Sequence, residues 1–177
     1  MKTKLLALIF ALFAVQLSAA QTVREANSAD VGSIDAIMRS VYDVISGDAG
    51  QPRDWDRFRT LFHKDARLIP TGKNKDGVHG ARALTPEDYI ERSGPFLIKE
   101  GFHERERARR VEQYGNIAHV FSTYEGFKGS AAKTPFVRGI NSFQLLNDGK
   151  RWWVMTIYWQ AETPDNPIPK KFLKSKN

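Results

Sequence analysis

His119 is the side chain in this sequence that is best suited to acid–base chemistry. It lies in the stretch "IAHVF", whose composition and pattern predict a β-strand. Neighbouring strand residues point to opposite faces, so His119 faces inward only if Ala118 and Val120 face outward. An imidazole titrates near neutral pH, and an inward His119 would therefore serve as a general acid or base. A position of His119 on the surface is the alternative.

The sequence has no grouping of metal ligands. Histidines stand at positions 63, 79, 103 and 119 without close spacing, and there is no cysteine. A metal site, a disulfide and a thiol nucleophile are therefore not expected. A phosphate-binding glycine loop and a nucleophile elbow are absent from the sequence as well. We expect a protein that works without a metal or another cofactor.

Polar side chains follow one another on one face of the strand predicted for "RWWVMTIYWQAE". A two-residue turn at Asp148 and Gly149 would pair Asn147 with Lys150 in a hairpin. The polar face would then consist of Asn141, Thr156, Tyr158 and Gln160. A buried polar group without a partner costs about 1–3 kcal/mol, so something polar should meet this face. These four residues predict a cavity that binds a small, mostly apolar molecule with one or two oxygens.

The opposite face of the same strand is large and apolar. It carries Trp153, Met155, Ile157 and Trp159, with Arg138 across the hairpin from Trp159. Aromatic residues, Met and Arg are enriched at subunit interfaces, so this face predicts a homodimer. In the alternative, the C-terminal segment "PDNPIPKKFL" covers this face within one chain. A β-bulge would exchange the two faces.

Helical patterns precede strand patterns along the chain. Ser28 or Asp30 can cap a first helix, whose apolar stripe lies over residues 34–45 and which should end near "SGDAG". A second helix is predicted in "RDWDRFRTLF", and a third begins at "TPED" and is disturbed at Gly94-Pro95. Between them, "ARLIPTG" predicts a short strand that Pro70 and Gly72 stop. From Phe102 onward the patterns predict antiparallel strands, and the charges of "HERERARR" are expected to form ion pairs on an exposed strand. This order predicts an α+β fold with helices on one face of a curved sheet.

In this order of elements, the stretches "WDRFRTLFHKDARLIPTG", "YGNIAHVFSTYE" and "DGKRWWVMTIYWQ" resemble the nuclear transport factor 2-like superfamily, near its SnoaL-like branch. The resemblance extends over about residues 30–162. It implies a cone in which about three N-terminal helices pack on a curved, mostly antiparallel sheet. It also implies an apolar pocket at the open end of the cone and dimers formed through the outer face of the sheet. The fold hosts isomerases, dehydratases, cyclases and binding proteins, so it does not name an activity.

The resemblance also implies where catalytic groups would lie. Related ketosteroid isomerases carry their base just before a "P-x-G" turn, and the matching position here is Ile69, so that base is missing. Asp65 matches another acidic position of the family, and a carboxylate at a turn is its plainer interpretation. Tyr42 falls where the isomerases carry a tyrosine that donates to an oxyanion. In the alternative, Tyr42 is a core residue with a satisfied hydroxyl.

The first twenty residues predict export. A basic start is followed by the apolar run "LLALIFALFAVQL" and by "SAA", the pattern of a signal peptide that is cleaved after Ala20. The run is short for a bilayer span, so we expect no stable membrane anchor and a periplasmic or secreted protein. The remaining boundaries are a short leader over 21–27, one domain over 28–165 and a basic tail over 166–177.

The missing base and the polar face favour a binding protein over the alternatives. The net charge of +7 comes partly from Lys2, Lys4 and the tail "KKFLKSKN", and no aromatic residue interrupts "HERERARR", so a nucleic-acid partner is not expected. We therefore expect an exported protein that binds a small apolar molecule. A cofactor-independent dehydratase, isomerase or hydrolase is the second hypothesis, which the missing base weakens. A packed interaction module is the third, which the polar face weakens.

Overall fold

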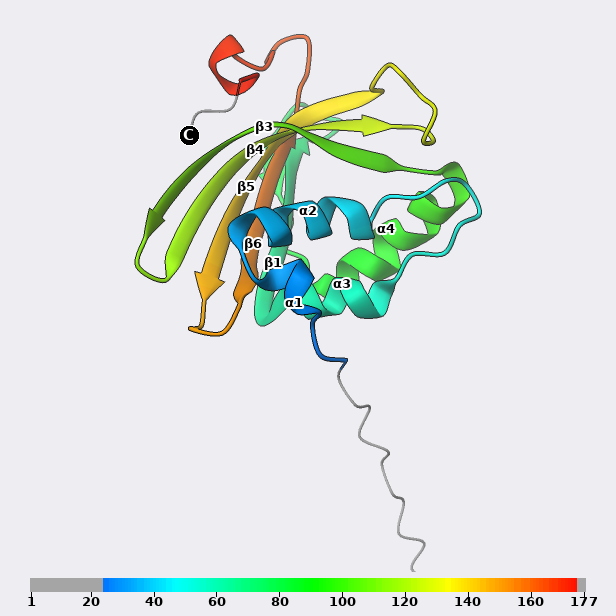
Figure 1. Cartoon of the computed structure of the whole chain (residues 1–177). Helices are drawn as coiled ribbons and strands as arrows, with labels where there is room; N and C mark the ends of the chain where they lie inside the picture. The colour runs from blue at the N-terminus through cyan, green and yellow to red at the C-terminus, as the bar shows by residue number, and fades with distance from the viewer. Residues whose placement is uncertain (1–23, 175–177) are drawn as a thin grey trace, which may run out of the picture.

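Residues 24–174 are described by the computed structural model, in which four α-helices pack against one face of a six-stranded sheet (Figure 1). The predicted signal peptide over 1–20 and part of the predicted leader lie outside the described residues, as do residues 175–177. The layers are those of the predicted α+β fold. Within residues 24–174, no helix has both the length and the apolar character needed to cross a membrane.

Side-chain caps fix where the helices begin. The helices are α1 (Ser28–Val31), α2 (Ile34–Val44), α3 (Trp55–Leu61) and α4 (Pro86–Glu100), and their N-caps are Asn27, Ser33, Asp54 and Thr85. Ser33 has an extended backbone and accepts a hydrogen bond from the amide of Ala36, so a new helix starts there. The single helix that the sequence predicted from Ser28 or Asp30 is therefore divided into α1 and α2. Helix α4 continues through Pro95 to Glu100, where the sequence predicted a disturbance.

The strands form one sheet that is antiparallel except at one junction. They are β1 (Phe62–Lys73), β2 (His79–Ala81), β3 (His103–Tyr114), β4 (Ile117–Phe127), β5 (Val137–Asn147) and β6 (Trp152–Ala161). Their order is β2-β1-β6-β5-β4-β3, and β1 pairs with β6 in parallel. Strand β1 runs past Pro70, which the sequence predicted as its stop, because the Pro70 carbonyl still accepts a hydrogen bond from the amide of Arg82.

The hairpin between β5 and β6 differs from the two-residue turn that the sequence suggested. Asn147 pairs with Trp152, so residues 148–151 form the loop. Asp148 holds this loop together by accepting hydrogen bonds from the amides of Lys150 and Arg151, both at 2.9 Å. The carboxylate of Asp148 therefore selects a four-residue loop over the shorter turn.

A β-bulge in β6 exchanges its faces halfway along. Leu145 pairs with Val154, but the preceding residue Gln144 pairs with Thr156, so Met155 is the extra residue. Beyond the bulge, Ile157 lies opposite Phe143, which is fully buried. Odd-numbered residues of β6 therefore face the helices after the bulge, whereas even-numbered residues do so before it.

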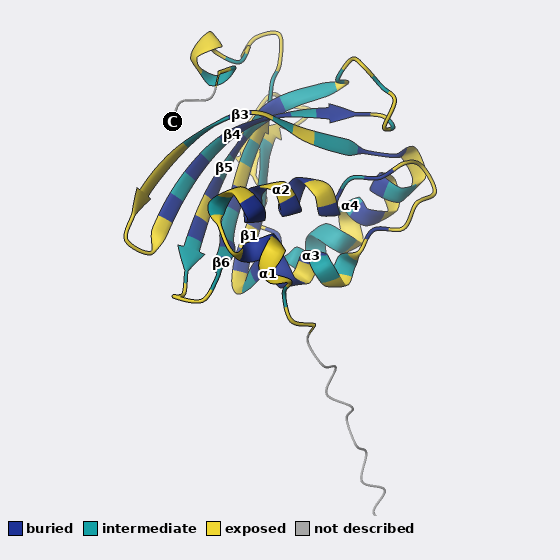
Figure 2. Cartoon of the chain, viewed as in Figure 1, coloured by how far each residue is buried: buried dark blue, intermediate teal, exposed yellow. Residues whose placement is uncertain are grey.

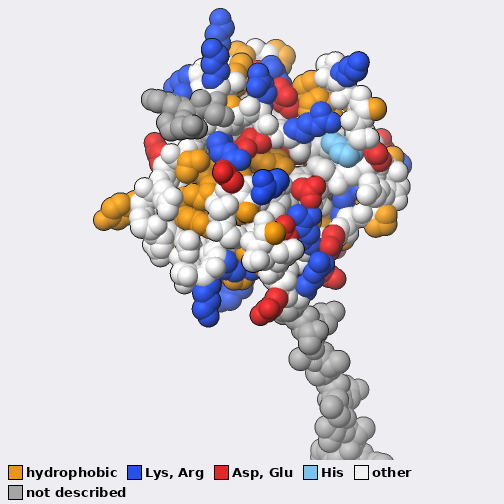
Figure 3. Space-filling view, viewed as in Figure 1, with side chains coloured by type: hydrophobic (Ala, Val, Ile, Leu, Met, Phe, Trp, Pro, Cys, Tyr) orange, Lys and Arg blue, Asp and Glu red, His pale blue; other side chains and the backbone are white. Residues whose placement is uncertain are grey.

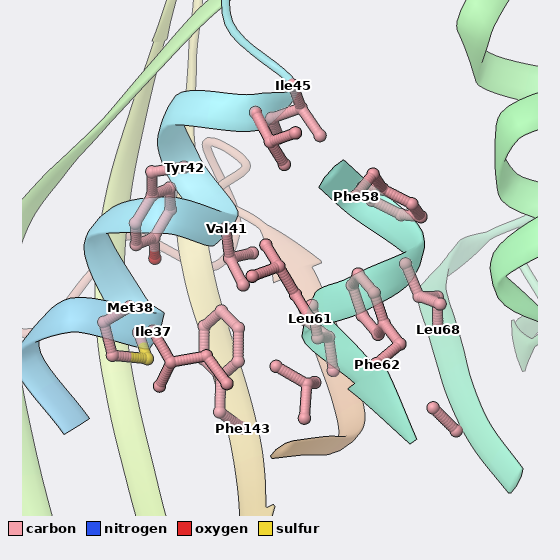
Figure 4. Close-up of a cluster of buried hydrophobic side chains, with 14 of the residues drawn as sticks. Ile37, Met38, Val41, Tyr42, Ile45, Phe58, Leu61, Phe62, Leu68 and Phe143 are labelled. Carbon is pink, nitrogen blue, oxygen red and sulfur yellow. The ribbon is translucent and has the colours of Figure 1, made fainter. Parts of the chain in front are cut away.

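The hydrophobic core fills the space between the helices and the concave face of the sheet (Figures 2 and 4). Helix α2 presents Ile37, Met38 and Val41 toward Phe143 of β5, with Leu61 of α3 beside them. Buried positions lie on the helix faces and strand segments that meet one another, and exposed positions on the outer surface of the helices. The core therefore fixes the curvature of the sheet around α2 and α3.

The C-terminal segment lies on the outer face of the sheet, opposite the helices (Figure 1). Its short 3-10 helix η1 (Lys170–Phe172) places Phe172 against Phe121, with ring centroids 5.1 Å apart. The Phe172 carbonyl accepts a hydrogen bond of 2.6 Å from the hydroxyl of Thr123. Part of the outer face is therefore covered by the C-terminal segment, at Phe121 and Thr123 of β4. The alternative from the sequence placed this cover over the residues from Trp153 to Trp159, two of which line the interior instead.

The apolar face predicted for a dimer interface does not exist as a continuous surface. Trp153 precedes the bulge and lies outside, where its ring nitrogen donates to Asp148 at 2.7 Å and its ring contacts the guanidinium of Arg151. Ile157 and Trp159 follow the bulge and line the interior. The prediction that these residues share one face with Met155 is wrong, because it assumed an unbroken strand.

A substitution at Gly139 can test the close packing of β4 against β5. A Cβ atom at this position would lie 2.5 Å from the hydroxyl of Tyr124 and would also collide with the Gln160 carbonyl. We expect Gly139→Ala to lower the free energy of unfolding by about 1–3 kcal/mol in chemical denaturation. Gly72→Ala is the matched control, because a Cβ atom on that strand glycine meets nothing within 4 Å. Equal stability of the two variants would contradict the packing described here.

Candidate functional site

A cavity of about 340 Å³ lies between the helices and the concave face of the sheet. Its walls are mainly apolar and come from α2, α3, α4 and all of the longer strands. The apolar lining includes Val41, Phe58, Phe102, Phe143, Ile157 and Trp159. From β5 and β6 it takes residues 137–143 and 157–159, the half of the hairpin that is distant from the loop at 148–151. Such a volume is near the lower end of the range of about 300–1,000 Å³ for small-molecule pockets.

Glu104 is the acidic group of this cavity. It lies near the start of β3, and its side chain accepts a hydrogen bond of 3.1 Å from the side-chain amide of Asn141. Burial in these apolar surroundings raises the pKa of Glu104 to about 7, although the bond from Asn141 acts in the opposite direction. Within the described chain, no Lys, Arg or His nitrogen forms an ion pair with Glu104. Glu104 is therefore present in both protonation states near neutral pH.

A chain of hydrogen bonds fixes the side chain of Asn141. Its amide also donates to the Tyr42 hydroxyl at 3.1 Å, and Tyr42 contacts the hydroxyl of Ser122 at 2.8 Å. Ser122 gives its single hydrogen to Glu106 at 2.6 Å, so the hydrogen between the two hydroxyls belongs to Tyr42. The hydrogen bonds therefore run in one direction, from Asn141 through Tyr42 and Ser122 to the carboxylate of Glu106. The two amide hydrogens of Asn141 and the hydroxyl hydrogen of Tyr42 are consequently not available to a ligand.

Two further tyrosines bring free hydroxyls to the cavity. Tyr89 of α4 and Tyr124 of β4 line it, and neither hydroxyl has a hydrogen-bond partner among residues 24–174. Burial raises the pKa of both phenols, and the negative charge of the nearby Glu104 adds to this increase. Both side chains therefore remain neutral at physiological pH, and each can donate or accept a hydrogen bond.

This arrangement combines an acid–base group with hydroxyl donors in apolar surroundings. Glu104 can take up or give a proton, and Tyr89 and Tyr124 can bind an oxygen or nitrogen of a ligand. Tyr42 is oriented by its partners and belongs to the wall of the cavity. The implied role of Tyr42 as a donor to an oxyanion is therefore wrong, because its hydrogen is directed away from the cavity.

The structure separates the polar residues that the sequence placed on one face. Asn141 lines the cavity, and Trp159 is its partner on β6. Tyr158 and Gln160 line a groove on the outer face of the sheet, and Thr156 lies on the same side of β6 as these two. The expectation of a shared polar face is therefore wrong for Thr156, Tyr158 and Gln160, because the bulge at Met155 turned them outward.

The weaker catalytic candidates also lie outside the cavity. His119 faces outward, where its Nε2 is 2.9 Å from the hydroxyl of Ser142. Asp65 is exposed on β1 and forms an ion pair of 2.7 Å with Lys64. Ile69 is paired with Tyr158 and shares its outward direction. Arg138, which the sequence predicted for the dimer interface, forms an ion pair with Glu162 at 2.7 Å. None of these side chains can reach a molecule held against Glu104.

Sequence reasoning missed Glu104 because it treated "HERERARR" as an exposed strand. Alternation in this stretch is real, but Arg105 points outward over the ring of Phe127 whereas Glu104 points inward. A signal was present, since Phe102 and Glu104 have the same parity and Phe102 is buried. In the described part of the chain, no group of three His, Cys, Asp or Glu residues is placed to hold a metal ion.

Solved structures with this arrangement of helices and sheet identify the fold. A protein of unknown function with a cystatin-like fold from Nostoc punctiforme has a TM-score of 0.57 at 10% identity, covering 80% of this chain and 97% of its own. A nuclear transport factor 2-like protein of unknown function from Silicibacter pomeroyi has a TM-score of 0.51 at 11% identity, covering 74% and 94%. This chain has the nuclear transport factor 2-like fold.

A third solved structure is that of a protein from Parabacteroides distasonis proposed to be a ketosteroid isomerase. It has a TM-score of 0.51 at 12% identity and covers 80% of this chain and 98% of its own. No protein-family model matches the sequence, and no curated protein matches it. At these identities the likeness establishes the nuclear transport factor 2-like fold and not an activity.

The raised pKa of Glu104 predicts how stability depends on pH. The folded protein keeps its proton up to about pH 7, whereas an unfolded Glu ionises near 4.5, so the folded state binds more protons between these values. The free energy of unfolding should therefore fall by about 2–3 kcal/mol as the pH rises through this window, relative to Glu104→Gln. Denaturation of both variants from pH 4 to 8 measures this difference.

Glu112→Gln controls for the loss of a negative charge, because Glu112 lies on the same strand with a side chain that is 88% exposed. We expect its stability to follow that of the unmodified protein over this pH range. Parallel curves for Glu104→Gln and the unmodified protein would show that Glu104 ionises as it does in water.

Proposed function

We propose that the protein binds a small, mostly apolar molecule in the cavity, with the polar group of that molecule next to Glu104, Tyr89 and Tyr124. One observation carries this proposal. In a cavity with mainly apolar walls, a carboxyl group and two phenol hydroxyls converge without satisfying one another. Apolar side chains at these positions would complete the packing of the core, so three polar groups around one space favour contact with the polar group of a ligand.

The size and position of the cavity support the same function. Its volume of about 340 Å³ suits a compact molecule. Helix α4 contributes the exposed residues Arg92 and Phe96 to the lining, so a ligand would enter past this helix. The sheet supplies a rigid wall, and the ligand would contact Phe102, Phe143 and Trp159 through its apolar part.

A cofactor-independent enzyme is the second candidate function, and the near-neutral pKa of Glu104 favours it. The carboxylate would remove a proton from a carbon next to a carbonyl, and a tyrosine hydroxyl would donate a hydrogen bond to the carbonyl oxygen. This base lies on β3, whereas the family resemblance placed the base of the isomerases at Ile69. Incubating keto compounds with the protein in deuterium oxide, and following exchange by NMR, tests this function.

We also propose that the protein is exported and self-associates through the outer face of the sheet. The sequence pattern over residues 1–20 supports export to the periplasm or the medium. Trp153 and Tyr158 remain available to support a homodimer through the outer face. Sedimentation at micromolar concentration would contradict the homodimer if it gave the mass of a single chain.

Tyr124→Phe tests the ligand site directly. Loss of one hydroxyl that has no protein partner should change the free energy of unfolding by less than about 0.5 kcal/mol. It should weaken the binding of hydroxyl and carbonyl compounds about three- to tenfold, as expected for one hydrogen bond. Calorimetric titration with phenethyl alcohol and phenylacetone measures the affinity. Tyr158→Phe is the matched control on the outer face, and an equal loss of affinity in both variants would place the ligand elsewhere.

Export makes a separate prediction about the N-terminus. Because small residues precede Gln21 in the signal pattern, we expect the exported protein to begin at Gln21. Mass spectrometry of the protein from envelope and medium fractions measures its N-terminus. An intact Met1 form in the membrane fraction would contradict cleavage.

A further inference from the structure

The carboxylate of Glu104 differs from the other shielded carboxylates of this protein. Asp30, Glu106 and Glu162 have side chains that are 12%, 19% and 17% exposed, and each forms an ion pair with an arginine. Glu104 lines the cavity and has a neutral partner, the amide of Asn141. Among these four carboxylates, the one without a cation is the one that lines the cavity between the helices and the sheet.

Aromatic rings enclose the same space. Tyr42, Tyr89, Phe102, Tyr124 and Trp159 line the cavity together with Glu104. The faces of such rings carry negative potential and attract organic cations, especially where water is excluded. A carboxylate among aromatic rings is therefore complementary to an ammonium group, whose apolar substituents would contact the remaining walls.

We propose that the ligand of this cavity is a small apolar amine, bound as its ammonium ion with Glu104 as the counter-ion. This inference rests on the proposed binding function and names the chemical class of the ligand. The ammonium group would donate hydrogen bonds to the Glu104 carboxylate and to the oxygens of Tyr89 or Tyr124. The ammonium group of the ligand would thus pair with Glu104, as arginines of the chain pair with Asp30, Glu106 and Glu162.

Neighbouring charges on β3 are engaged elsewhere. Next to Glu104 in sequence, His103 contacts Asp48 at 2.9 Å, and Arg105 donates to the Ser130 carbonyl at 3.1 Å. Glu106 is paired with Arg109 and accepts from Ser122. The negative charge of Glu104 is therefore the one on this strand that remains for a ligand in the cavity.

Charges on the facing helices lie toward solvent. Helix α4 contributes Tyr89 and the exposed Arg92, and helix α2 contributes Tyr42 and the exposed Arg39, which borders the cleft on the other side of Glu104. Water and salt screen the two exposed guanidinium groups, whereas an ion pair in the cavity is screened much less. The neutral phenols of Tyr89 on α4 and Tyr124 on β4 contribute acceptor oxygens.

The charge of the ligand determines how binding depends on pH. An ammonium ion binds the ionised form of Glu104, so its affinity should rise about tenfold per pH unit below the pKa of this group and level off above it. A neutral hydroxyl or carbonyl compound should bind equally well or better as the pH falls. The affinity of an amine should therefore rise with pH, whereas that of a neutral compound should stay constant or fall.

Phenethylamine and phenethyl alcohol form a matched pair of probes, because they share one skeleton and differ in the polar group. Titration of the full-length protein by calorimetry, with tryptophan fluorescence as a second signal, measures both affinities between pH 5.5 and 8.5. At pH 8 we expect the affinity for phenethylamine to be higher than that for phenethyl alcohol by about tenfold or more. Glu104→Gln, which keeps the size of the side chain, should remove this preference, whereas the exposed control Glu112→Gln should retain it.

The outcomes separate the inference from the function on which it rests. Tighter binding of phenethyl alcohol or phenylacetone than of phenethylamine would overturn the inference and leave the proposed binding function standing. Equal loss of amine affinity in Glu104→Gln and Glu112→Gln would also overturn it, since the charge would then act from a distance. Failure of all three probes to bind would count against the proposed function itself. A Glu104-dependent preference for the amine that grows with pH would support the inference.

Discussion

The two hydrogen bonds donated by the side chain of Asn141 hold the interior of the cone together. One joins β5 to Tyr42 of α2, and the other joins it to Glu104 of β3, both at 3.1 Å. Through Tyr42 and Ser122 the chain of donors ends at the carboxylate of Glu106, which sets the direction of every hydrogen along it. Helix and sheet are thus linked by polar contacts at the point where hydrophobic packing gives way to open space.

An empty cavity of this kind lowers the stability of the folded protein. A cavity forfeits contacts between its walls, and an unpaired carboxyl group beside it raises the cost of folding further. Proteins tolerate such departures at functional sites, where groups with shifted pKa values are retained for binding or proton transfer. Glu104 fits this description, because apolar surroundings shift its pKa and no cation of the described chain compensates for its charge.

On the face shown in Figure 3, Lys and Arg are interspersed with Asp and Glu, and the apolar side chains form small groups between them. On the other side of the sheet, Phe172 of the C-terminal segment packs on Phe121 and receives a hydrogen bond from Thr123. The carboxyl and phenol groups that favour a small-molecule partner, Glu104, Tyr89 and Tyr124, all line the cavity between the helices and the sheet.

The sequence by itself determined most of the elements, because helical spacing, the cap at Thr85 and strand alternation are local properties, and their order predicted the α+β layers. The family resemblance implied the nuclear transport factor 2-like fold, which the solved structures confirm. Tertiary structure decided which side chains meet. The extra residue at Met155 reversed the faces of β6, and hydrogen bonds of Asp148 set the hairpin register. Glu104 became a cavity group only because β3 turns it toward α4 and β4. A strand pattern predicts that successive side chains point to opposite faces of the sheet. Which face is covered depends on the register and curvature of the sheet. Both are fixed by contacts between residues far apart in the chain.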